Sequence, residues 1–260
     1  MFQQFTDFLV WVDDKVWGIP LIVLILAVGI YLTCRLHILQ IRHLPKALKF
    51  MVKNEEDGTG EVTSFGALCT ALSATIGTGN IVGVATALVA GGPGALFWMW
   101  IAAFLGMATI FAEAIMAQKY KQVGKDGEIT GGPVYYIRAA FKGTFGKVLA
   151  GIFAVLIILA LGFMGNAVQS NSIAAAFHTA FGIPQVAMGV IIAILALFVF
   201  VGGMKRIAKV TETIVPIMAA LYIVGALIVI IYNYKNIPYA FHAIVVGAFN
   251  PAAISGGAVG

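Results

Sequence analysis

The stretch Ser73–Gly83, SATIGTGNIVG, lies inside an apolar segment long enough to cross a bilayer. It places glycines, two threonines and an asparagine where a membrane helix normally carries leucines. In one interpretation, Gly79 and Gly83 form a GxxxG motif that lets two helices pack closely. In the other, the helix unwinds at Gly77 and Gly79, freed carbonyls bind a cation, and freed amides bind a carboxylate. The residues alone leave both interpretations open.

The composition indicates an all-α polytopic membrane protein. Hydrophobic residues make up 61% of the chain and charged residues 10%, whereas soluble domains carry roughly 25% charged residues. The N-terminal stretch 1–17 is expected to lie at a membrane interface. The apolar segments are predicted at 18–35, 65–90, 94–119, 147–177, 185–203, 210–232 and from about 239 onward.

The basic residues predict the orientation of these segments. Of the 16 Lys and Arg residues, all except Lys15 and Lys235 lie on one side of the alternating spans. By the positive-inside rule that side is cytoplasmic, which makes linkers 36–64 and 120–146 cytoplasmic and the N-terminus external. We therefore expect a multi-pass plasma-membrane protein.

Two other segments carry polar or helix-breaking residues. The seventh segment contains FNPAAISGG, and paired interruptions in two spans point to a transporter site built from broken helices. In the fourth segment, Asn166 and Gln169 share one helical face, which fits either hydrogen bonding between helices or a polar cavity lining. Glu113 is the one acid well inside an apolar run. Its nearness to Lys119 favours snorkelling to the inner surface or a structural ion pair over a functional role.

No nucleophile–base pair and no metal-ligand spacing occurs in the sequence, so we expect no enzymatic activity and no organic cofactor. A channel is also disfavoured, because no span carries filter motifs or rings of charge.

Four stretches together resemble the alanine or glycine:cation symporter family, prokaryotic carriers that couple small neutral amino acids to sodium. These are FGALCTALSATIGTGNIVGVATALVAGGPGALFWMWIAAFLGMATIFAEAIMAQKY (65–120), GEITGGPVYYI (127–137), NAVQSNS (166–172) and GGMKRIAKVTETIVP (202–216). The resemblance implies the leucine-transporter fold, with ten core helices in two inverted repeats. Residues 1–64 would then form an extra helix and a basic linker, 65–233 the first repeat, and 234–260 the start of core helix 6. Core helices 7 to 10 are expected in such a carrier and are absent from this chain.

The resemblance also implies roles for individual residues. Backbone carbonyls of Ser73 and Ile76 would bind the coupling Na⁺, and amides of Thr78 and Gly79 would bind the substrate carboxylate. The remaining substrate-site residues would be Asn80, which could only brace the break, together with Asn166, Gln169, Phe249 and Gly256. The expected function is sodium-coupled symport of alanine or glycine by alternating access. The alternatives are a non-transporting half-carrier and a proton-coupled amino-acid permease.

Overall fold

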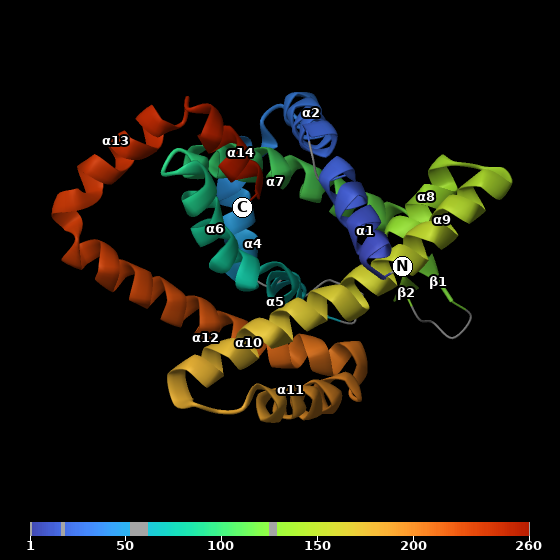
Figure 1. Cartoon of the computed structure of the whole chain (residues 1–260). Coiled ribbons are helices and arrows are strands. Elements are labelled where there is room, and N and C mark those ends of the chain that lie inside the picture. Colours follow the sequence, from blue (N-terminus) through green and yellow to red (C-terminus); the bar gives the residue numbers. More distant parts are fainter. Residues whose placement is uncertain (1, 17–18, 53–61, 125–128, 260) are drawn as a thin grey trace. The chain divides into compact units, whose positions relative to one another are not determined.

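The computed structural model describes residues 2–16, 19–52, 62–124 and 129–259, most of which are helical (Figure 1). The chain forms two compact units. The first unit comprises Met1–Pro45, Thr86–Tyr136 and His242–Gly260, and the second comprises Lys46–Ala85 and Ile137–Phe241.

The elements wholly within the first unit are α1 (Phe2–Val16), α2 (Ile19–Arg35), α3 (Leu39–Arg42), α7 (Ala95–Lys119), the antiparallel pair β1 (Gln122–Val123) and β2 (Ile129–Thr130), and α14 (Pro251–Val259). Those within the second are α5 (Ser64–Thr75), η1 (Thr78–Asn80), α9 (Gly143–Ile157), η2 (Ile158–Gly165), α10 (Asn166–Phe181), α11 (Gln185–Phe200), α12 (Gly203–Tyr232) and η3 (Tyr234–Asn236). Four helices cross the boundary: α4 (Leu44–Val52), α6 (Val82–Gly91), α8 (Pro133–Ala140) and α13 (Ile237–Gly247).

Three stretches of helix are long and apolar enough to cross a membrane: Ala95–Lys119, Gly143–Phe181 and Gly203–Tyr232. Shorter apolar helices cover the other predicted segments, including Pro20–Arg35 and Gln185–Phe200. These helices agree with the predicted all-α membrane protein. The orientation of the spans stays a prediction, and Lys53 and Lys125, two of the basic residues on which it rests, lie outside the described residues.

Both predicted interruptions are present. The segment expected at 65–90 divides into α5, the single 3₁₀ turn η1 and α6. The seventh segment divides into α13, which ends at Gly247, and α14, which begins at Pro251. Proline suits the first position of a helix, where its missing N–H costs no hydrogen bond.

In the first unit, α7 packs against both α2 and α14, and backbones approach closely near α14. A Cβ added at Gly94 would collide with the backbone of Gly247, and one added at Gly256 would collide with Gly91. Glycine is therefore required where these helices meet, because no side-chain atom fits between the backbones. In the second unit, α12 packs against α5.

Candidate functional site: the break between α5 and α6

The break after α5 is stabilised by one reciprocal pair of hydrogen bonds. The amide of Gly77 donates to Oδ1 of Asn80 over 2.9 Å, and the amide of Asn80 donates to the Gly77 carbonyl over 3.2 Å. Asparagine competes well with regular helix because its side chain bonds to nearby backbone. The Asn80 side chain thus braces the break.

Gln169 on α10 closes the same break from a distant part of the sequence. The amide of Thr78 donates to Oε1 of Gln169 over 3.1 Å. A Cβ at Gly77 would collide with Nε2 of Gln169, so a side chain there would displace the carboxamide of Gln169. The structure therefore brings together three of the predicted site residues, Thr78, Asn80 and Gln169.

The break also redirects the amides that a continuous helix would use internally. In such a helix the amides of Gly77 and Thr78 would donate to the carbonyls of Ser73 and Ala74. Here they donate to Asn80 and Gln169 instead. The Asn80 amide, which would donate to the Ile76 carbonyl, donates to Gly77. The carbonyls of Ser73 and Ile76, both predicted sodium ligands, thereby lose their helical donors.

Gly79 is the most open position of the break. Among the described residues, its amide has no hydrogen-bond partner, and a Cβ built on it would meet no atom within 4 Å. An unused amide beside open space at the start of a helical turn is suited to an anionic group. In the described part of the chain, no group of three His, Cys, Asp or Glu side chains could hold a metal ion.

Asn166 is not drawn into the break. Its Nδ2 donates to the Gly162 carbonyl, one turn earlier in the chain, over 3.2 Å. The π-helix η2 immediately precedes it. A π-helical turn contains extra residues and shifts the face presented by the helix that follows, and such turns are frequent at functional sites. The sequence analysis did not predict η2.

The second break, between α13 and α14, contains the two other predicted site residues. Phe249 is exposed and Gly256 is buried against Gly91. Both belong to the first compact unit, whereas residues 77–80 belong to the second. Their participation in a substrate site stays a prediction.

Two side chains missed by sequence reasoning stabilise that second break. Oδ1 of Asn250 accepts the Ala252 amide over 3.1 Å, and Nε1 of Trp98 donates to the Ala248 carbonyl over 2.7 Å. The indole N–H of Trp98 is thus bonded within the protein. Each break thus contains an asparagine whose carboxamide oxygen accepts a backbone N–H.

A carboxylate missed by the sequence analysis contacts α5. Thr63, the residue before α5, donates from Oγ1 to Oε1 of Glu212 on α12 over 2.5 Å. The partners lie 149 residues apart, so no local pattern signals their contact.

The Glu113 carboxylate affects the pKa of Tyr136 in the short helix α8. Burial raises the pKa of Tyr136, and the Glu113 carboxylate adds to that rise.

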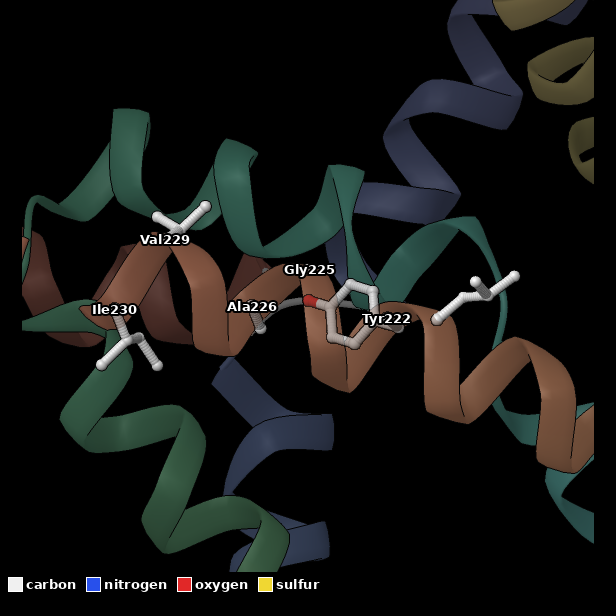
Figure 2. Close-up of a pocket in the computed structure, with 6 residues that line it drawn as sticks. Tyr222, Gly225, Ala226, Val229 and Ile230 are labelled. Atoms are coloured by element: carbon white, nitrogen blue, oxygen red, sulfur yellow. The ribbon is translucent and has the colours of Figure 1, made fainter. Parts of the chain in front are cut away.

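A separate groove on α12 has no features of a polar ligand site. Figure 2 shows the residues that line it and labels all except Leu221. They all belong to α12: Leu221, Tyr222, Gly225, Ala226, Val229 and Ile230. An apolar surface formed by one helix of a membrane protein suits lipid or another helix.

The comparisons with known proteins agree with this architecture. The sequence profile of the sodium:alanine symporter family matches residues 2–260. The chain is 47% identical to an uncharacterized transporter of Haemophilus influenzae over 250 residues, covering 96% of this chain and 54% of that protein. It is 46% identical over 252 residues to the sodium/alanine symporter AgcS of Methanococcus maripaludis, covering 96% and 56%. It is 42% identical over 254 residues to the putative sodium/proton-dependent alanine carrier protein YrbD of Bacillus subtilis, covering 98% and 51%.

The chain spans about half the length of the curated relatives that it matches. The profile match extends over nearly all of its residues, including both breaks and Gln169. The chain belongs to the sodium:alanine symporter family.

Proposed function

We propose that this protein acts within a carrier as long as its relatives. That carrier would couple the uptake of a small neutral amino acid, alanine or glycine, to sodium. The observation that carries the proposal is the break at residues 77–80, where backbone carbonyls and amides leave the helical pattern and Gln169 faces them. Broken helices at which ions and amino acids bind are characteristic of secondary transporters.

The cation would bind at the C-terminal end of α5. The carbonyls of Ser73 and Ile76 have lost their helical donors, and the partial negative charge at a helix C-terminus favours a cation. Oxygen ligands of this kind suit a hard ion such as Na⁺. Bound sodium would hold the unwound backbone in one conformation, so the amino acid would meet a preordered site.

The amino-acid carboxylate would bind to the amides of Thr78 and Gly79. The Gly79 amide faces open space, whereas the Thr78 amide donates to Gln169. A carboxylate must therefore displace Oε1 of Gln169 from Thr78. The Nε2 group of Gln169 can then turn and donate to the same carboxylate. Gln169 would thus change from the acceptor of the Thr78 amide to a donor to the substrate.

The resemblance to the symporter family also implies substrate contacts at the second break. We assign residues 65–233 to the first inverted repeat of a leucine-transporter fold and 234–260 to the start of core helix 6, with 1–64 as an extra helix and basic linker. The similar interruptions of α5–α6 and α13–α14, each with a bracing asparagine, support this assignment. Backbone groups near Phe249 and Gly256 would bind the substrate ammonium. The carrier would lie in the plasma membrane, with its basic linkers on the cytoplasmic side.

The test is uptake of radiolabelled alanine into proteoliposomes containing the purified full-length carrier. We expect uptake when sodium is high outside, and loss of uptake when potassium replaces sodium at the same pH. Undiminished uptake in potassium that follows an imposed proton gradient would support the proton-coupled permease instead. Absence of uptake of alanine, glycine and the larger glutamine under every gradient would reject the proposed transport activity.

A further inference from the structure

We propose that Glu212 is a positioning residue, whose carboxylate holds the first turn of α5 against α12, and whose release lets α5 move away from α12. This inference rests on the proposed function, because α5 carries the carbonyls assigned to the ion at its other end. It identifies a residue that acts on the site through a helix, without touching either ligand.

A chain of two hydrogen bonds connects the carboxylate to the start of α5. The amide of Gly66 donates to Oγ1 of Thr63 over 2.9 Å, and the same oxygen donates its proton to Oε1 of Glu212. Thr63 therefore caps α5 in the usual way for threonine and simultaneously carries the contact to α12. A carboxylate at this position also interacts favourably with the partial positive charge of a helix N-terminus.

The sequence around the contact leaves room for the carboxylate. A Cβ added at Gly66 would collide with Oε1 of Glu212, so a side chain there would push the carboxylate away. The start of α5 thus has a hydroxyl donor at its N-cap, Thr63, and no side chain at Gly66. Both features fit the carboxylate of Glu212.

A second polar contact between α5 and α12 joins two neutral hydroxyl groups. One turn further along α5, Oγ1 of Thr70 lies 3.1 Å from Oγ1 of Thr211, a neutral pair. Both hydroxyls also bond to their own helices, Thr70 to Gly66 and Thr211 to Ala208. Hydrogen bonds with an ionised partner are roughly twice as strong as neutral ones. The Thr63–Glu212 hydrogen bond is therefore the stronger of these two polar contacts to α12.

The contact is suited to breaking and re-forming. Thr63 is exposed and Glu212 is only half-buried, so water can solvate both groups once they separate. Lys209 lies three residues before Glu212 on the same face of α12, where it can compensate the released carboxylate. Because α5 has 12 residues, a tilt at its first turn is transmitted along a rigid helix of about 18 Å to the carbonyls at its end.

The chain contains its own reporter of this movement. Cys69, three residues after Gly66 on α5, is buried with 1% of its surface exposed. The other cysteine of the chain, Cys34, is exposed on α2. A small thiol reagent reacts with Cys69 only when α5 opens, because the reagent cannot reach a buried sulfur.

The test uses the full-length carrier in proteoliposomes with Cys69 as its single cysteine, and measures the rate of labelling by N-ethylmaleimide. Thr63→Val removes the donor and keeps the shape of the side chain, so we expect labelling about tenfold faster than in wild type. Thr63→Ser keeps the hydroxyl, so its Cys69 should be labelled at about the wild-type rate. Thr213→Val is the matched control, because the Thr213 hydroxyl bonds to Lys209 on its own helix.

A second variant and a second readout separate positioning from general destabilisation. Glu212→Asp keeps the charge but shortens the side chain by one methylene, so it should also speed the labelling of Cys69. In uptake assays Thr63→Val should raise the sodium concentration for half-maximal alanine uptake, a quantity that lower amounts of folded protein would leave unchanged.

Wild-type labelling rates in both Thr63→Val and Glu212→Asp would overturn the inference, as would equal acceleration by Thr213→Val. The labelling rates do not depend on transport. If the wild-type carrier showed no sodium-dependent uptake, the proposed function would fail while the role of Glu212 would still be decided.

Discussion

The backbone amide of Thr78 donates to the side-chain oxygen of Gln169 across 91 residues of sequence. This bond places a neutral carboxamide oxygen on the amide to which we assign the substrate carboxylate. The two acceptors are similar in geometry, and the carboxylate carries the charge that makes its bonds to amides stronger. Gln169 therefore satisfies the broken backbone and can yield to a better acceptor.

Replacement of Gln169 by Ala is expected to weaken alanine binding. The variant loses the hydrogen bond from Nε2 to the bound carboxylate, and a bond to a charged group is worth about 2 kcal/mol, or roughly thirtyfold in affinity. Titration of alanine into the purified full-length carrier at saturating sodium measures the change.

Asn166→Ala is the matched control for this substitution. It removes a carboxamide three residues earlier on the same helix, whose bond runs to the Gly162 carbonyl, one turn earlier in the chain. We expect an affinity within about twofold of wild type, since only a local bond is lost. Equal losses in Gln169→Ala and Asn166→Ala would remove the reason to distinguish the two side chains.

Gly77→Ala is expected to impair the site by displacing Gln169. The added Cβ collides with Nε2 of Gln169, so the single substitution should reduce alanine affinity by at least about tenfold. In the double variant Gly77→Ala/Gln169→Ala the collision disappears, and the combined loss should be smaller than the sum of the single losses. Additive losses in this double-mutant cycle would contradict the contact.

Gly79→Ala provides a contrasting case at the same break. Its Cβ enters open space, so the thermal stability of the carrier should remain close to that of wild type. Alanine affinity should nevertheless fall, because the methyl group occupies the space that we assign to the substrate. Unchanged affinity in Gly79→Ala would move the substrate away from this amide.

Gly94→Ala tests the close packing of the first unit. The new methyl group meets the backbone of Gly247, which cannot rotate away as a side chain would, so we expect destabilisation of about 1–3 kcal/mol. Gly106→Ala on the same helix α7 meets nothing within 4 Å and should change stability by less than about 1 kcal/mol. Thermal unfolding in detergent, followed by tryptophan fluorescence, compares the two variants. Equal melting temperatures would contradict the packing.

The main features of the fold follow from the sequence because membrane spans have a strong local signal. Runs of apolar residues predicted the apolar helical segments, and FNPAAISGG indicated an interruption, since glycine, asparagine and proline weaken helices locally. SATIGTGNIVG by itself fitted either close helix packing or an unwound break, and the structure contains the break. The bracing role of Asn80 was also predictable, because its partner Gly77 lies three residues away.

Other features depend on tertiary structure and could not be predicted in this way. The partners Thr63 and Glu212 lie 149 residues apart, and Trp98 and Ala248 lie 150 residues apart. No periodicity encodes such pairs. The π-helix before Asn166 has the same apolar composition as an ordinary α-helix, so its extra residues have no signature in the sequence.

The most direct test of the central claim, that one break binds both the ion and the amino acid, is the reciprocity of their binding. Alanine affinity of the purified full-length carrier is measured in sodium and in potassium at equal pH and ionic strength, and sodium affinity is measured with and without alanine. A shared site predicts that sodium tightens alanine binding by a factor between about 5 and 150, and that alanine tightens sodium binding by the same factor. Alanine affinity that is equal in sodium and in potassium would contradict it.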